Sequence, residues 1–426
     1  MKRLSDCSRS FCLLLCSAVL TACVVNPVTG QRELGLISER EEIAIGEQNY
    51  LAGQQMQGGR YTTDPVLNDY VTSVGKRLVA VSDRPGLPYE FVVLNNSVPN
   101  AWAMPGGKIA INRGLLIEMD SEAELAAVLG HEIVHAAARH SARQMERGLL
   151  LQLGVAAVAV GTRDESLAPL LVGGAAVAAG LLSQRYSREA ELEADLYGMR
   201  YMHRAGYHPD AAVDLQRTFV RLSEGRQSSW LEGLFASHPP SMERVEANQR
   251  TAERLGREGR MDRERYQARI ATLKATQSAY DAHDRARKAL GEGDTDTARR
   301  LARQALEAEP REALFHGLLG DIALREEQPQ QAVEHYEAAL QRNNEYFAFH
   351  LGAGVAMQNL RNHARARAHL EESIRLLPTA TAHYHAGNAA RAMGDNEAAI
   401  NHYRTAAQSD SEAGARARRA LQEMGA

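Results

Sequence analysis

Hydrophobic positions follow a helical period over most of the chain, with one exception at residues 87–116. There the apolar runs 91–94 and 108–111 are short and rich in β-branched residues, and Pro, Gly and Asn bound them. Runs of this kind are typical of strands. The pattern therefore predicts a mainly α protein with one small sheet in its first half.

A helix is predicted to begin after Ser121, because Ser121 and Glu124 form the Ser-x-x-Glu pattern of a capping box. Leu125, Leu129 and Ile133 follow at helical spacing. Residues 38–48 predict a second helix, with acidic side chains in its first turn. Both helices precede the longest apolar runs of the chain.

Two apolar runs, Leu149–Gly161 and Leu167–Leu182, are separated by a short charged stretch. Each is shorter than the roughly 18 residues expected of a spanning helix, and both are rich in Gly and Ala. We therefore predict buried or interfacial helices here. A tilted or kinked membrane hairpin is the alternative.

The last third of the chain repeats itself at intervals of 33 or 34 residues. Small and large positions recur together, as at Ala298, Ala332, Ala366 and Ala399, at Ala302, Tyr336, Leu370 and Tyr403, and at Gly320, Gly354 and Gly387. This interval is that of a tetratricopeptide helix-turn-helix unit, whose array presents a surface suited to protein partners. A plain helical bundle with accidental periodicity is the alternative.

The N-terminus has the layout of a secretory signal: basic residues, an apolar run over 11–20 and a small-residue boundary. That boundary, Leu20-Thr21-Ala22-Cys23, is similar to the lipobox of bacterial lipoproteins, in which the cysteine is lipid-modified. We predict a signal over 1–22, a lipidated tether over 23–37 and a membrane anchor at Cys23. An ordinary signal peptide with an incidental cysteine is the alternative.

Net charge and cysteine content limit the partners and the metal ligands that we expect. The formal net charge of -4 offers no basic footprint, so we expect no nucleic-acid partner. The four cysteines are Cys7, Cys12, Cys16 and Cys23, and none would remain as a free thiol after cleavage and lipidation. A metal site in the mature chain would therefore use histidines and carboxylates.

His131, Glu132 and His135 form a His-Glu-x-x-His motif within the helix predicted after Ser121. Residues four apart share one helix face, so the two histidines can bind a single zinc ion. Zinc would lower the pKa of a bound water and polarise a scissile carbonyl, while Glu132 would act as general base. An accidental match is the alternative.

A catalytic zinc needs a third protein ligand. The metzincin pattern is excluded, because Ala138 and Ser141 stand where it requires glycine and histidine. His140 is one residue out of place, and we expect it to be a solvated helix histidine. A carboxylate from a second helix remains, and residues 187–195 are the candidate, with Glu191 and Asp195 four residues apart on one face.

These two motifs resemble the HEXXH peptidases that include HtpX and the CAAX prenyl endopeptidases, whose second motif is Glu-x-x-x-Asp. The resemblance implies an α+β zincin-like domain that binds one zinc ion per subunit. It implies that Glu191 is the third zinc ligand and that Asp195 orients a ligand histidine or donates a proton. For Glu189 and Glu193 we expect a solvated helix face.

Two further segments extend the resemblance. Residues 100–109 resemble the family's strand before the zinc helix, so Gly107, Lys108, Ile109 and Ala110 are predicted to form the edge that pairs with an extended substrate. His238 and Arg244 resemble the family's His-Pro element. In relatives that also carry tetratricopeptide repeats, that histidine can occupy the water's position on zinc, which makes His238 a candidate regulatory switch.

Taken together, these observations predict a zinc metallopeptidase domain over 38–265 and a tetratricopeptide solenoid over 266–426. The resemblance implies an endopeptidase of the periplasm that cleaves unfolded or stalled envelope proteins. The lipobox adds a lipid anchor at Cys23, which we expect in the outer membrane because Val24 is not the aspartate associated with inner-membrane retention. The repeats would recruit these clients and the machinery that assembles outer-membrane β-barrels. The alternative is a chaperone or scaffold with a latent zinc site.

Overall fold

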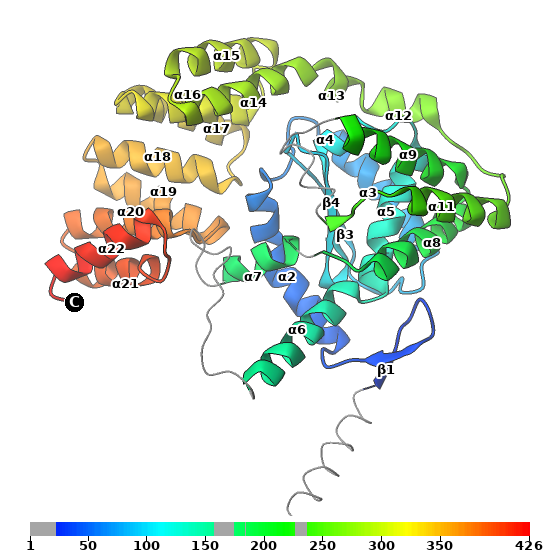
Figure 1. Ribbon diagram of the computed structural model, residues 1–426. Helices are drawn as coiled ribbons and strands as arrows, with labels where there is room; N and C mark the ends of the chain where they lie inside the picture. The colour runs from blue at the N-terminus through cyan, green and yellow to red at the C-terminus, as the bar shows by residue number, and fades with distance from the viewer. Residues whose placement is uncertain (1–22, 157–173, 184, 226–236) are drawn as a thin grey trace, which may run out of the picture.

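The computed structural model describes residues 23–156, 174–183, 185–225 and 237–426 (Figure 1). An N-terminal region, residues 23–276, holds the small sheets, and a C-terminal array of helix pairs, residues 277–426, curves beside it (Figure 1). The predicted mainly α fold with a small sheet and a helical array is confirmed. The predicted signal, residues 1–22, lies outside the described residues.

The described helices of the N-terminal region surround a three-stranded sheet. They are α2 (Glu39–Met56), α3 (Pro65–Val79), η1 (Pro105–Gly107), α4 (Arg113–Leu116), α5 (Glu122–Ala137), α6 (His140–Ala156), α7 (Gly174–Leu182), α8 (Arg188–Arg204), α9 (Asp210–Gly225), α11 (Met242–Leu255), α12 (Arg263–Arg269) and α13 (Ala271–Ala275). The predicted helix at residues 38–48 is α2, which a full capping box between Ser38 and Glu41 begins.

The sheet consists of β3 (Glu90–Leu94), β4 (Ala101–Met104) and β5 (Lys108–Asn112), in the order β3-β5-β4. β5 is parallel to β3 and antiparallel to β4. The apolar runs 91–94 and 108–111 predicted two of these strands, β3 and β5. The chain reaches the central position through η1, where Gly106 and Gly107 have φ angles of 75° and 85° that favour glycine.

The prediction that residues 107–110 form the substrate-pairing edge is wrong. Ile109 pairs with Phe91 on one side and with Ala103 on the other, so β5 has no free edge. Lys108 is buried and forms an ion pair with Glu90. The turn at η1 inserts β5 between its neighbours, which leaves β4 as the edge strand that packs next to α5.

The stretch predicted as a tether is an ordered hairpin. β1 (Cys23–Val25) pairs antiparallel with β2 (Arg32–Leu34). Glu33 forms an ion pair with Arg143 of α6 at 2.5 Å, and the backbone N–H groups of Leu36 and Ile37 donate to the Glu146 carboxylate at 2.9 Å. These polar contacts fix the segment to α6, which apolar periodicity could not predict.

Part of the two long apolar runs lies in α6 and α7, and residues 157–173 lie outside the described residues. Within the described part of the chain, no helix has both the length and the apolar character needed to cross a membrane.

The array consists of consecutive helix pairs, each packed on the next (Figure 1). Its helices are α14 (Gln277–Glu292), α15 (Thr295–Ala308), α16 (Ala313–Arg325), α17 (Pro329–Arg342), α18 (Phe347–Asn359), α19 (His363–Leu376), α20 (Ala380–Ala392), α21 (Asn396–Ala406) and α22 (Glu412–Glu423). The recurring glycines lie where the paired helices touch. A Cβ on Gly320 would lie 2.8 Å from the Tyr336 ring, and one on Gly387 would lie 2.6 Å from the Tyr403 ring.

The core of the N-terminal region continues beyond residue 265. Tyr266, Ile270 and Leu273 are buried in it, together with residues of α3 and α5. The array then contacts this region through Glu312, a buried residue at the start of α16. Its carboxylate accepts hydrogen bonds from Thr63, Asn95 and Tyr280, so one side chain joins the two parts of the molecule.

Candidate active site

α5 presents His131, Glu132 and His135 from its buried third turn. The predicted helix start is confirmed: the Ser121 hydroxyl accepts a hydrogen bond from the backbone N–H of Glu124. Leu125 and Leu129 of the same helix are fully buried in the core. α5 is thus anchored by its apolar face, and its polar motif is fixed within the protein.

α8 lies directly against α5 because two glycines meet at the crossing. A Cβ on Gly198 would lie 2.9 Å from the backbone nitrogen of His131, and one on Gly130 would lie 3.0 Å from the Gly198 carbonyl oxygen. The close approach brings Glu191 and Asp195 of α8 to the histidines. Sequence analysis missed this glycine pair, since the two residues are far apart along the chain.

Three side chains place possible metal donors around one point. The Nε2 atoms of His131 and His135 are 2.9 Å apart. Glu191 Oε2 lies 3.5 Å from His131 Nε2, and Glu191 Oε1 lies 3.3 Å from His135 Nε2. All three side chains are buried.

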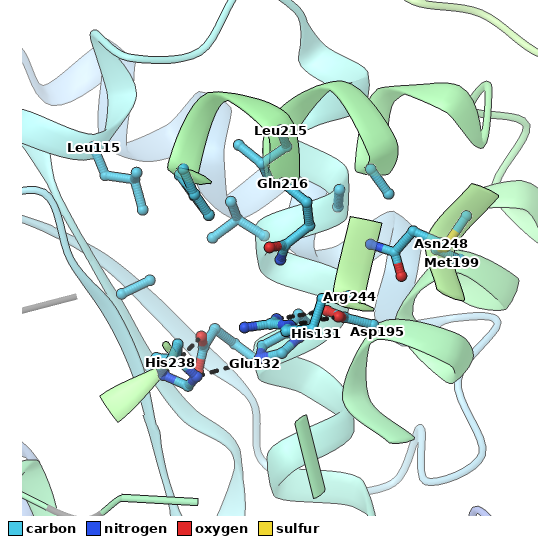
Figure 2. Close-up of a pocket in the computed structure, with 15 residues that line it drawn as sticks. Leu115, His131, Glu132, Asp195, Met199, Leu215, Gln216, His238, Arg244 and Asn248 are labelled. Carbon is cyan, nitrogen blue, oxygen red and sulfur yellow. Dashed lines mark hydrogen bonds and ion pairs between the residues drawn. The ribbon is translucent and has the colours of Figure 1, made fainter. Parts of the chain in front are cut away.

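Asp195 and Arg244 hold the far side of His131 (Figure 2). Asp195 Oδ1 lies 2.9 Å from His131 Nδ1. Arg244 donates to both carboxylate oxygens of Asp195 at 2.7 Å, and its Nη1 lies 2.9 Å from Glu191 Oε2. A guanidinium that donates to both oxygens of a carboxylate fixes the orientation of the carboxylate and stabilises its negative charge. One guanidinium therefore positions both carboxylates of α8.

His135 is held by residues that sequence analysis assigned to solvent. The expectation of a solvated His140 is wrong, because it is buried with its Nδ1 2.7 Å from His135 Nδ1. Its Nε2 lies 3.1 Å from Glu193 Oε1, so Glu193 faces the site network, whereas Glu189 is exposed. Tyr186 stacks on the His135 ring with centroids 3.8 Å apart. Only the i, i+5 spacing of His135 and His140 hinted at this network.

His238 lies among the same donors, from the loop before α11. Its Nδ1 is 3.0 Å from Glu191 Oε1 and 3.3 Å from His131 Nε2. Its Nε2 is 3.7 Å from Glu132 Oε1. The ring is buried, so the four side chains His131, His135, Glu191 and His238 form one compact cluster.

The electrostatics of the cluster favour a cation. Burial opposes a charged His131, but the carboxylates of Glu191 and Asp195 outweigh it and raise the pKa of His131 to about 10. Burial lowers the pKa of His135 well below its usual value. Burial also raises the pKa of Glu132. Negative charge from α8 thus accumulates around the two motif histidines.

An apolar cavity of about 40 Å³ lies next to Glu132 and opens beside the cluster (Figure 2). Ala101 of the edge strand β4 lines it, as do Val128, Leu215 and Phe219. Gln216 also lines it and is buried, and its Oε1 has no hydrogen-bond partner among the described residues. The cavity therefore combines apolar walls with two acceptors that lack a partner among the described residues, Gln216 Oε1 and Glu132 Oε2.

The donor set fits a catalytic zinc ion. Zinc sites of hydrolases use three protein ligands of nitrogen and oxygen type, and bond lengths near 2.05 Å place tetrahedral donors about 3.3 Å apart. The distances from Glu191 to the two histidines, 3.3 and 3.5 Å, agree with this spacing. Glu132 Oε2 is buried without a hydrogen-bond partner in the described part of the chain, which suits a base facing water or substrate.

Of the other predicted site residues, Lys108, Ile109 and Ala110 lie in the central strand and take no part in the cluster. Cys23 begins the hairpin strand β1.

Family models match both parts of the chain. The model of peptidase family M48 matches residues 65–252, and three tetratricopeptide models match residues 283–346, 323–389 and 380–412. The predicted repeats are thereby confirmed.

Curated relatives cover different parts of the chain. The β-barrel assembly-enhancing protease of Escherichia coli K12 is 28% identical over 329 residues, 67% of this chain and 66% of the relative. The mitochondrial metalloendopeptidase OMA1 of Schizosaccharomyces pombe is 36% identical over 41% of this chain and 50% of its own length. The metalloprotease YcaL of Escherichia coli K12 is 32% identical over 40% of this chain and 67% of its own. This chain thus spans slightly less than two thirds of the first of these relatives.

Proposed function

The chain belongs to peptidase family M48, and from this premise we propose that it is a zinc endopeptidase whose metal is held by His131, His135 and Glu191. The observation that carries the proposal is the convergence of these three donors beside Glu132, whose Oε2 has no hydrogen-bond partner among the described residues. Relatives named as metalloprotease and metalloendopeptidase support it.

When bound, zinc supplies Lewis acidity, which polarises a carbonyl and lowers the pKa of water. Glu132 accepts the proton of the attacking water and passes it toward the leaving amine. Asp195, fixed by Arg244, accepts the Nδ1 hydrogen of His131 and keeps its Nε2 directed at the metal position. His140 and Glu193 hold His135 in the same way.

We propose that substrate binds as an extended segment along β4, Ala101–Met104, the edge strand next to α5. The cavity beside Glu132 would accept one substrate side chain. Its volume of about 40 Å³ and its apolar walls favour a small apolar group. Because an extended backbone must be exposed for strand pairing, the preferred substrates are unfolded or misassembled chains.

The likeness to a β-barrel assembly-enhancing protease supports a role in quality control of outer-membrane proteins. The repeats would recruit stalled clients or the assembly machinery, since such arrays commonly present protein-binding surfaces. The Leu20-Thr21-Ala22-Cys23 sequence supports a periplasmic location with a lipid anchor in the outer membrane. Mass spectrometry of the mature N-terminus tests the anchor, and an unmodified Cys23 would exclude it.

We propose that His238 keeps the enzyme latent by supplying a fourth donor to the metal. Support comes from its Nδ1, which lies 3.0 Å from Glu191 and 3.3 Å from His131. A ring at this position would compete with water for the metal. Proteolysis then requires the loop before α11 to withdraw His238.

The decisive test is the substitution Glu132→Gln, with Glu189→Gln as matched control because Glu189 is exposed on α8. Glu132→Gln should bind one zinc ion per chain, measured by metal analysis, and lose at least roughly a hundredfold of its cleavage of an unfolded protein. Glu189→Gln should retain both properties. Equal and measurable cleavage by Glu132→Gln and the parent, under conditions in which the parent is active, would refute the proposal.

A further inference from the structure

Histidines recur in the array at positions related by its repeat. His350 and His369 are 19 residues apart, as are His383 and His402, and the second pair follows the first by 33 residues. Each pair joins the first helix of a unit to the second: α18 to α19, then α20 to α21 (Figure 1). The family resemblance and the active-site motifs do not account for these residues.

The two pairs have the same geometry. The Nδ1 atoms of His350 and His369 are 3.1 Å apart, and those of His383 and His402 are also 3.1 Å apart. Ring centroids are separated by 5.3 Å in both pairs, with interplanar angles of 39° and 46°. The distance between Nδ1 atoms is close to the roughly 3.3 Å between two imidazole nitrogens on one tetrahedral ion.

A backbone contact sets the tautomer of His350. Its Nε2 lies 3.0 Å from the Asn344 carbonyl oxygen, so that nitrogen donates its hydrogen and leaves the Nδ1 lone pair directed toward His369. An outer hydrogen bond of this kind orients ligand histidines in metal sites. His316 repeats the arrangement one unit earlier, with its Nε2 3.1 Å from the Pro310 carbonyl oxygen.

Three of the four rings are partly exposed, so an ion in solution can reach both pairs. His369, His383 and His402 are half-buried, and His350 is 9% exposed. Burial and the neighbouring His402 lower the pKa of His383 to about 4, and burial and His350 lower that of His369.

A simple hydrogen bond between two imidazoles is the competing explanation for each pair. It requires one ring to donate from Nδ1 and would leave no site for an ion. The first unit of the array offers an internal comparison, because Ala282 and Leu301, also 19 residues apart, occupy the two matching positions. The first unit folds without either histidine, so the fold does not require the pair, whereas the second unit repeats both histidines as His316 and His335.

We propose that the pairs His350/His369 and His383/His402 each bind one divalent transition-metal ion through their Nδ1 atoms. Imidazole nitrogens select ions such as Cu²⁺, Ni²⁺ and Zn²⁺. Water completes the coordination, since the described residues bring no third His, Cys or carboxylate donor into either pair. A bound ion links the two helices of one unit and stiffens the array at two successive repeats.

The test uses the full chain with its catalytic site loaded with zinc, titrated with Cu²⁺ and followed by calorimetry and electron paramagnetic resonance. Parent protein should bind Cu²⁺ with two-nitrogen hyperfine coupling. His350→Ala and His383→Ala should each lose one equivalent, and the double variant should lose two. His369→Ala should lose the same equivalent as His350→Ala, and combining the two should lose no more.

His363→Ala is the matched control, because His363 lies on α19 and belongs to no such pair among the described residues. It should bind as many equivalents as the parent. Circular dichroism of each variant verifies that the helices are retained. Equal Cu²⁺ binding by the parent, His350→Ala and His383→Ala, or coupling to a single nitrogen in the parent, would overturn the proposal.

Discussion

At the scale of single residues, the two motif histidines are oriented by different neighbours. His131 contacts Asp195, which Arg244 fixes from two directions. His135 contacts His140, whose other nitrogen faces Glu193. Because a ligand ring that can rotate binds metal more weakly, both contacts contribute to the metal site without touching the metal.

We predict that Glu193→Gln weakens zinc binding about 10- to 100-fold, the usual effect of removing an outer partner of a ligand histidine. The loss of negative charge leaves His140, and through it His135, less firmly oriented. Competition with a chelator of known zinc affinity measures the change. Glu189→Gln, on the exposed part of α8, should bind zinc as the parent does, and an equal affinity of Glu193→Gln would contradict the assigned network.

A second prediction at this scale concerns His238. If its ring occupies the water position with an advantage of about 1.4 kcal/mol, His238→Ala should raise the cleavage rate about tenfold. The measurement is hydrolysis of an unfolded protein under conditions where the parent is slow. His363→Ala, which removes a histidine from the array, serves as control. A lower rate in His238→Ala would indicate that the ring supports catalysis instead.

At the scale of elements, close contacts between helices depend on glycine. Gly198 allows α8 to approach the backbone of His131 on α5, and Gly320 allows α16 to receive the Tyr336 ring of α17. Neither contact leaves room for a side chain. Glycine at the contact therefore brings the two motifs together in the N-terminal region. In the array it lets the two helices of a pair pack closely.

We predict that Gly320→Ala destabilises the array by about 1–3 kcal/mol, because its Cβ would lie 2.8 Å from Tyr336 and force the pair apart. Gly291→Ala is the matched control, since a Cβ there meets nothing within 4 Å. In a helix this control should be neutral or up to about 1 kcal/mol stabilising. Urea unfolding followed by helical signal distinguishes the two, and equal midpoints would contradict the argument.

At the scale of the whole molecule, the array is joined to the N-terminal region by a shared apolar core, which includes Tyr280 and Phe315 of the array, and by polar contacts. Glu312 accepts hydrogen bonds from Thr63 at 2.8 Å, Asn95 at 3.0 Å and Tyr280 at 2.6 Å. The Gln55 side chain donates to the Glu345 carbonyl oxygen in the loop before α18 and accepts from the backbone N–H of Phe347, the first residue of α18. These contacts fix the start of the array against the N-terminal region.

We predict that Glu312→Ala loosens this junction, because the buried donors Asn95 and Tyr280 lose their acceptor, at about 1–3 kcal/mol for each group left unsatisfied. The half-buried Thr63 hydroxyl loses the same partner but can turn to water. The two parts should then unfold in separate steps, where the parent unfolds in one, and protease should cut the chain between them sooner. Calorimetry and limited proteolysis measure both effects. Glu307→Ala, at an exposed position of α15, should behave as the parent.

Local sequence was enough to predict the elements. The Ser121 cap and the apolar period determined α5, and a period of 33 or 34 residues determined the array, because caps and helical spacing are properties of neighbouring residues. The motifs also singled out Glu191 and Asp195 from the other acidic residues of α8. Their roles toward zinc stay predictions.

Only the tertiary structure determined which strands pair and which side chains from distant segments come into contact. β5 lies in the centre of the sheet, so β3 and β4 are its two edge strands, and β4 is the one next to α5. His140 and Glu193 face the site because α6 begins beside α8, although both types of residue are usually solvated. Strand order and buried polar contacts depend on how distant segments pack, and periodicity along one segment carries no information about its partner.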